Sequence, residues 1–170
     1  MTTSFTFDEF NKRLQNYGCH CFPGNTRIAG GKGAPVDQSD ELCRELARCK
    51  SCVEMTYPGH DADQGKFKYS INGGAIDCSE NTDAKLDQCL CDKHFAEQLG
   101  NIWTDAGFNE FYWSNKHNSA ATFDRDATCV AGPSGNTQDA CCGASPLWRP
   151  YSSTAFECCT NGSIASIGSC

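Results

Sequence analysis

Short motifs rich in cysteine, histidine and aspartate are the parts of this sequence that could bind a metal ion. The segments CHC at 19–21 and CKSC at 49–52 offer thiol and imidazole groups, which are the ligands of zinc sites. Zinc sites usually pair two such motifs at a defined spacing, and disulfide formation would use the same thiols. His60, Asp61 and Asp63 could bind Ca²⁺ weakly, although we expect a solvated loop there. We therefore expect no metal site and no cofactor.

Acid–base catalysis would need a histidine beside a nucleophile or an activated water. The chain has four histidines, which are scattered along the sequence: His20, His60, His94 and His117. None of them belongs to a recognisable triad with serine or cysteine. The histidines therefore predict no catalytic site.

The composition indicates a secreted protein stabilised by disulfide bonds. Fourteen of its 170 residues are cysteines, an even number that the reducing cytosol would rarely tolerate. No signal peptide is visible at the start, as expected if it was removed from the numbering or if Met1 was added to a mature form. No apolar run approaches the roughly 18 residues of a membrane span. The net charge of −7 disfavours nucleic acid and anionic membranes, because both attract basic patches.

The spacing of apolar residues predicts a mainly α-helical chain. We expect an amphipathic helix over 5–14, a helix capped by Ser39, and a longer helix over 83–103. The alternating segment KFKYSI and the glycine turn at 72–74 predict a hairpin between the two longer helices. The aromatic residues of 108–113 should pack against the helices.

The character of the chain changes near residue 123. From there leucine, isoleucine and valine are scarce, so that only disulfide bonds could hold a fold. We therefore expect one domain over 1–122 and an irregular cysteine-rich tail over 123–170, packed on or beside it.

Four separated motifs resemble those of secreted phospholipase A2, and they occur in the same order. They are YGCHC at 17–21, GAPVD at 33–37, KYSINGGAIDC at 68–78 and CLCDKHFA at 89–96. The resemblance covers roughly residues 5–100. It implies an antiparallel helix pair with a small two-stranded β-wing, and thus a mainly α, disulfide-rich fold.

The resemblance also indicates which chemical groups are missing. In that family, one helix carries a histidine that activates water and an aspartate that helps to bind Ca²⁺. Leu46 and Ala47 occupy these positions, while the carboxylate that orients the histidine is kept as Asp92. Leu46 cannot act as a base, and Ala47 offers no side-chain oxygen to a cation. The preceding loop is longer than the family's, so we expect no enzymatic activity, and we expect Asp92 to pair with Arg44, Arg48 or a backbone N–H.

The resemblance implies three complete disulfide bonds and half of a fourth. They are Cys21–Cys43, Cys49–Cys91 and Cys78–Cys89, with Cys19 bonded to the C-terminal region. A further disulfide bond of the family is absent, because both of its cysteine positions hold other residues, Leu42 and Gln98. The pairing of the other cysteines stays open: Cys52, Cys129, Cys141, Cys142, Cys158, Cys159 and Cys170.

The tail carries a pattern of its own, with two adjacent-cysteine pairs around a tyrosine. Its residues are Cys141, Cys142, Gly143, Tyr151, Cys158, Cys159 and Gly162. This pattern is similar to the dicysteine repeats of galaxin-type proteins of animal extracellular matrices. The tail also contains an acceptor pattern for N-glycosylation at Asn161.

Together these features predict a non-catalytic secreted protein that serves as an extracellular structural or assembly component. Its partners would be other extracellular proteins or further copies of itself. One alternative is a protein that binds a lipid or another hydrophobic ligand, or a non-enzymatic toxin subunit. The other alternative is a divergent lipid hydrolase that uses different residues.

Overall fold

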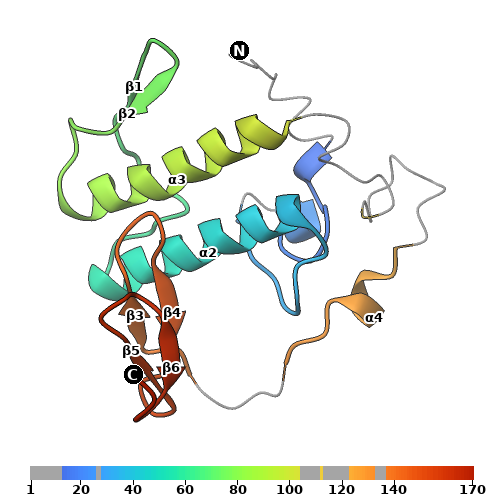
Figure 1. Cartoon of the computed structure of the whole chain (residues 1–170). Coiled ribbons are helices and arrows are strands. Elements are labelled where there is room, and N and C mark those ends of the chain that lie inside the picture. The colour runs from blue at the N-terminus through green and yellow to red at the C-terminus, as the bar shows by residue number, and fades with distance from the viewer. Residues whose placement is uncertain (1–12, 26–27, 104–111, 113–122, 133–136) are drawn as a thin grey trace. The chain divides into compact units, whose positions relative to one another are not determined.

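The computed structural model describes residues 13–25, 28–103, 112, 123–132 and 137–170. Two long helices dominate this part of the chain, α2 (Gln38–Thr56) and α3 (Asp83–Ile102) (Figure 1). Two short helices accompany them, η1 (Pro23–Asn25) and α4 (Arg125–Thr128). No helix in these ranges is long and apolar enough to cross a membrane.

The strands within the described ranges are three residues long and pair into antiparallel hairpins. The hairpins are β1 (Ser70–Asn72) with β2 (Ala75–Asp77), β3 (Ala140–Cys142) with β4 (Arg149–Tyr151), and β5 (Phe156–Cys158) with β6 (Ile164–Ser166). With the two long helices and seven disulfide bonds, these hairpins complete the mainly α, disulfide-rich fold that the sequence predicts.

The chain forms two compact units, each built from two separate stretches. Residues 1–47 and 95–133 form the first unit, and residues 48–94 and 134–170 form the second. Both α2 and α3 contribute residues to each unit. The expected division into a domain over 1–122 and a cysteine-rich tail over 123–170 stays a prediction.

Asp37 caps the start of α2. Its Oδ1 accepts a hydrogen bond from the N–H of Asp40 at 2.9 Å, and its carbonyl accepts one from the N–H of Glu41. This is the pattern of an N-cap aspartate. The prediction that Ser39 caps this helix is therefore wrong, because Ser39 lies inside the first turn and is fully buried.

Aromatic rings and one disulfide bond form one buried cluster of the first unit. The bonded pair Cys19–Cys129 packs with Phe123. The ring of Tyr112 meets the rings of Tyr17 and Phe123 edge to face, with centroids 6.2 and 5.6 Å apart. Such pairs favour this geometry because the positive edge of one ring faces the negative face of the other.

Two sequence predictions fall largely outside the described residues. Of the amphipathic helix expected over 5–14, the described part includes Leu14, which is fully buried. Of the aromatic segment over 108–113, it includes Tyr112, whose ring meets those of Tyr17 and Phe123 outside the helices, so that packing of the segment against the helices stays a prediction.

In the second unit, α2 and α3 run antiparallel. Cys49 of α2 is bonded to Cys91 of α3, and the hydroxyl of Tyr57, just beyond α2, donates to Asp87 at 2.8 Å. The contact partner of a later residue in the α2 region is thus an earlier residue of α3, as antiparallel helices require. The β1–β2 hairpin lies between these helices in the sequence and turns at 73–74, as predicted.

The segment 137–170 is more regular than the sequence predicts. It folds into two hairpins, held by bridges from Cys142 to Cys158 and from Cys159 to Cys170. Cys141, next to Cys142 on β3, is bonded to Cys52 of α2 and so joins this segment to the helix. Strands of three residues are too short to give a readable alternation, which explains why the sequence indicated only an irregular tail.

Candidate functional site

A glycine-rich loop before α2 is held in place by the buried carboxylate of Asp40. This carboxylate accepts hydrogen bonds from the backbone N–H groups of Cys19, His20 and Val36 at 2.9, 2.7 and 3.0 Å. Asp40 lies in the first turn of α2, where the helix dipole favours a negative charge. A Cβ at Gly18 would lie 2.4 Å from the Asp40 Cγ, so the close approach requires glycine.

The loop carbonyls at 19 and 20 are both occupied by hydrogen-bond donors. The guanidinium of Arg125 donates to the Cys19 carbonyl at 2.7 Å, and the N–H of Gly30 donates to the His20 carbonyl at 2.7 Å. The His20 ring reaches the Gly33 carbonyl at 3.0 Å and is itself buried. These groups close the loop on itself.

Ala47 lies directly against this loop. A Cβ built on Gly30 would lie only 2.9 Å from the Cβ of Ala47, so the loop backbone and the Ala47 methyl are in close contact. Leu46, the preceding residue of α2, is 5% exposed. These two positions therefore present hydrocarbon where the family resemblance implies a base and a metal ligand.

Asp92 forms an ion pair with Lys50 in the second unit. Its Oδ1 lies 3.1 Å from the Lys50 Nζ, which also lies 3.6 Å from Asp63. Burial raises the pKa of Asp92 above its ordinary value, while the charge and hydrogen bond of Lys50 act in the opposite direction. The partner is thus a lysine outside the expected set of Arg44, Arg48 and a backbone N–H group.

The pairing of Lys50 with Asp92 could have been predicted from the sequence. Lys50 and Asp92 each follow directly a cysteine of the bridge Cys49–Cys91. Residues next to a bridged pair on two antiparallel helices are held near each other, and opposite charges there are well placed to pair. Asp40 and Gly30 had no comparable signal, because their contacts depend on the fold of the loop.

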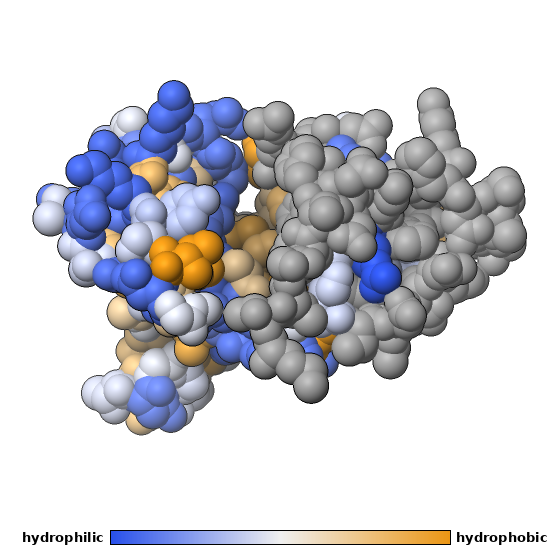
Figure 2. Space-filling model, turned by 90° about the horizontal axis from the view of Figure 1, so that it is seen from above, coloured by the Kyte–Doolittle hydropathy of each residue, from blue (hydrophilic) through white to orange (hydrophobic). Residues whose placement is uncertain are grey.

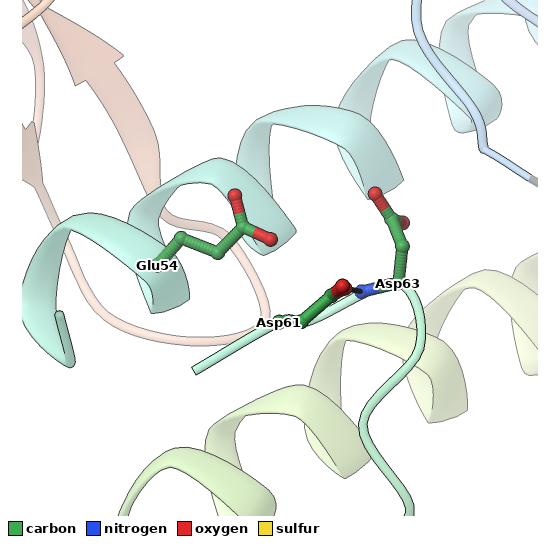
Figure 3. Close-up of side chains that lie close together, drawn as sticks. All are labelled: Glu54, Asp61 and Asp63. Carbon is green, nitrogen blue, oxygen red and sulfur yellow. Dashed lines mark hydrogen bonds between the residues drawn. The ribbon is translucent and has the colours of Figure 1, made fainter. Parts of the chain in front are cut away.

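Three carboxylates gather at the end of α2 and in the turn that follows it: Glu54, Asp61 and Asp63 (Figure 3). One oxygen of each lies within 4.8 Å of the others. Glu54 accepts the N–H of Ala62 at 3.0 Å, and Asp61 accepts those of Asp63 and Gln64 at 2.9 and 2.8 Å.

These contacts show what the three acids do within the protein. Glu54 and Asp61 shape the turn, while Asp63, whose pKa is raised by burial, lies 3.6 Å from the Lys50 Nζ. The ring of His60 is directed to Gln88 at 2.8 Å rather than to this group. The expectation of a solvated loop without a metal site at His60, Asp61 and Asp63 stays a prediction, although carboxylate oxygens are suitable ligands for Ca²⁺.

All fourteen cysteines are paired within the chain. The bridges Cys21–Cys43, Cys49–Cys91 and Cys78–Cys89 join the residues that the resemblance implied. Cys19 is bonded to Cys129. The four cysteines that CHC and CKSC contribute are therefore all in disulfide bonds.

A family model of phospholipase A2 matches residues 1–112 of this chain. The mouse protein named "Phospholipase A2, membrane associated" is 39% identical over 82 residues, which are 48% of this chain and 51% of the mouse protein. The human protein of the same name is 30% identical over 106 residues, covering 62% of this chain and 68% of the human protein.

The matches also include proteins named as homologs. "Basic phospholipase A2 homolog ammodytin L" from Vipera ammodytes ammodytes is 34% identical over 77 residues, covering 45% of this chain and 49% of that protein. The chain spans about half the length of most of these relatives.

The matched region contains the capped helix α2, the β1–β2 hairpin and α3. It also contains three disulfide bonds that tie these elements together. Because the family model matches well over half of the sequence, this chain belongs to the phospholipase A2 family.

Proposed function

We propose that this chain is a secreted, non-catalytic member of its family, and that it acts as an extracellular structural or assembly component. The observation that carries the proposal is the contact between Ala47 and the loop backbone at Gly30. At position 47 the loop backbone meets a methyl group, which has no oxygen to offer a cation. Leu46 beside it offers no lone pair, so neither half of the family's chemistry has a group to perform it.

The ion pair of Asp92 also supports a non-catalytic role. In an active member this carboxylate would orient a histidine, as the resemblance implies. In this chain its charge is balanced by Lys50 at 3.1 Å. An ion pair between two helices is a structural contact, and it needs no substrate.

An assembly role is supported by apolar side chains that stand in solvent. In the second unit these are Tyr69, Ile71, Leu147, Phe156 and Ile167, each at least 40% exposed. Figure 2 shows hydrophobic residues among hydrophilic ones on one face of the molecule. Contiguous exposed apolar groups mark interaction sites, and Phe156 and Ile167 stand near each other because Phe156 pairs with Ser166 in the β5–β6 hairpin.

The cysteine-rich segment supports this role in a second way. Two pairs of cysteines that are adjacent in the sequence, at 141–142 and 158–159, follow the galaxin-like pattern. That resemblance is the basis for proposing a matrix component. Because all cysteines are paired within the chain, the assembly we propose is non-covalent.

Two measurements on the oxidised full chain test the proposal. Release of fatty acid from phospholipid vesicles with Ca²⁺ should stay at background, while an active secreted phospholipase A2 serves as the positive control. Turnover above background would contradict the non-catalytic assignment and favour the divergent hydrolase.

Assembly is tested by sedimentation velocity over a wide range of concentration. The mean mass should increase with concentration, and a double variant Tyr69→Ser/Ile71→Ser or Phe156→Ser/Ile167→Ser should reduce the increase. A constant monomer mass, alone and with extracellular-matrix extract, contradicts the assembly role. Lipid that co-purifies with such a monomer and is identified by mass spectrometry would favour the hydrophobic-ligand alternative.

A further inference from the structure

The pattern Asn-x-Ser/Thr occurs once in the whole sequence, at Asn161-Gly162-Ser163. This is the acceptor pattern for N-linked glycan, which is used when the asparagine is accessible and x is not proline. The other asparagines lack a hydroxyl residue two positions later. Modification at a single position would therefore be unambiguous to detect.

The three residues form the exposed end of the β5–β6 hairpin. Cys159 and Ser163 close the turn, with the Cys159 N–H donating to the Ser163 carbonyl at 2.8 Å. The Gly162 N–H donates to the Cys159 carbonyl at 2.9 Å. Gly162 has φ +79°, and a Cβ there would meet no atom within 4 Å, so the turn stands free. Asn161, Gly162 and Ser163 are all exposed.

The side-chain amide of Asn161 has a defined orientation in this turn. Its Oδ1 accepts the Ser163 hydroxyl at 2.7 Å and the Ser163 backbone N–H at 3.0 Å. A backbone N–H can only donate, so the atom that it meets must be the amide oxygen. The Nδ2 of Asn161 consequently points away from the turn, and it makes no hydrogen bond to any residue that the structure describes.

We propose that Asn161 carries an N-linked glycan, transferred from a lipid-pyrophosphate-linked oligosaccharide in the secretory pathway. In this step Nδ2 forms a bond to the anomeric carbon of the first sugar, whose bond to the pyrophosphate oxygen breaks. The lipid pyrophosphate leaves with that oxygen, and the proton lost by Nδ2 balances the one negative charge that the oxygen gains. The Ser163 hydroxyl lies on the amide itself, which is the placement that the third residue of the pattern needs.

A glycan at this turn is compatible with the rest of the hairpin. In the register of β5 and β6, Cys158 faces Ile164 next to the turn, and Phe156 faces Ser166 at the far end. At about 3.3 Å per residue, the turn lies roughly 10 Å from Phe156. The sugar would thus leave the exposed apolar end uncovered, while it shields the bridge at Cys158 from solvent. This inference requires secretion but not the absence of catalysis.

The test is secretion of the full chain from cultured mammalian cells behind a cleavable signal. Peptide N-glycosidase should increase its gel mobility, and the shift should be lost in Asn161→Gln and in Ser163→Ala. Asn72→Gln is the matched control, since Asn72 also stands before a glycine in a hairpin turn but has Gly74 in place of the serine. The control should keep the shift.

A second readout does not depend on the variants being secreted. Release of the glycan in heavy-oxygen water should leave labelled aspartate at position 161 of the wild-type chain, which peptide mass spectrometry locates. Protein that is secreted with all seven disulfide bonds but without label and without a mobility shift would overturn the proposal.

Discussion

Lys50 of α2 and Asp92 of α3 form an ion pair with 3.1 Å between Nζ and Oδ1, directly beside the Cys49–Cys91 bridge. The side chains are 13% and 29% exposed. Because the bridge already fixes the backbone at both positions, bringing the two charges together costs less conformational entropy than it would for an isolated surface pair. The pair therefore contributes more than the usual exposed salt bridge.

Replacement of Lys50 by methionine should destabilise the fold by about 2 kcal/mol. This lies between the ~0–1 kcal/mol of an exposed pair and the ~3–5 kcal/mol of a fully buried one, because Asp92 would lose its partner while half-buried. The measurement is the free energy of unfolding in urea with the disulfide bonds intact.

A matched control for this variant is Lys68→Met. Lys68 pairs with Glu80 at 3.6 Å, but both side chains are largely exposed. Its loss should cost less than ~1 kcal/mol. Equal effects of the two substitutions would contradict the greater contribution assigned to the Lys50–Asp92 pair.

The stability of the chain should carry a pH dependence that Asp92→Asn removes. Burial raises the pKa of Asp92 in the folded state above its ordinary value of 3.8, against the opposing effect of Lys50, and the nearby charge of Asp63 raises it further. The folded state then retains a proton that the unfolded chain has lost. Stability relative to the Asn variant should therefore fall as pH rises through the interval just above 3.8.

Urea unfolding of both proteins between pH 3 and 7 measures this difference. A difference that rises with pH over the same interval would show instead that the pKa of Asp92 is lowered.

Gly30→Ala should destabilise the fold more than Gly59→Ala does. Both glycines have positive φ, at +119° and +91°, so both substitutions strain the backbone. Only the new Cβ at position 30 meets another atom, the Ala47 Cβ at 2.9 Å, whereas that at 59 meets none within 4 Å. We expect an extra cost of about 1–3 kcal/mol, typical of overpacking.

A double-mutant cycle with Ala47→Gly isolates this contact. In the Gly30→Ala background, Ala47→Gly removes the clash, so its cost should be at least ~1 kcal/mol smaller than in the wild-type protein. Additive effects would show that the two residues are not in contact. The same result would remove the main support for the non-catalytic assignment.

Removal of the Cys52–Cys141 bridge should loosen the segment 137–170 from α2. The double variant Cys52→Ala/Cys141→Ala should lose about 2–4 kcal/mol of stability. Amide hydrogen exchange should speed up over β3 and β4, while α3 stays protected by its own bridges at Cys89 and Cys91.

The matched control removes the bridge that closes the C-terminal loop. Cys159→Ala/Cys170→Ala should affect exchange near residues 159–170 and leave β3 and β4 protected. If both variants changed exchange in the same residues, the proposed anchoring role of Cys52 would be wrong.

Apolar spacing and motifs predicted the two long helices α2 and α3 and the β1–β2 hairpin, and the family resemblance implied three disulfide bonds. These features depend on local periodicity or on a motif whose cysteines keep a fixed order. Leu46 and Ala47 could likewise be recognised as replacements of the family's histidine and aspartate. Cys43 and Cys49 on either side fix the alignment of this helix with the family's motif.

Contacts that depend on loop conformation could not be predicted. Asp37 and Ser39 are equally good caps, and only the path of the loop selects Asp37. The buried role of Asp40 and the approach of Gly30 to Ala47 likewise need the folded loop. The pairing of Cys52 and the cysteines of 137–170 was open because any arrangement of these thiols satisfies the sequence equally well.

The neighbouring cysteines on β3 couple correct disulfide pairing to the correct register of the strand. Successive side chains of a strand point to opposite faces, so Cys141 and Cys142 meet their partners Cys52 and Cys158 on opposite sides of β3. An exchange of these two partners would require the strand to slip by one residue against β4, which turns every side chain of β3 to the wrong face. A mispaired molecule would thus also be a misregistered one. Such a molecule would be less stable because its side chains are misplaced. Disulfide exchange would therefore continue until the pairing and the register are both native.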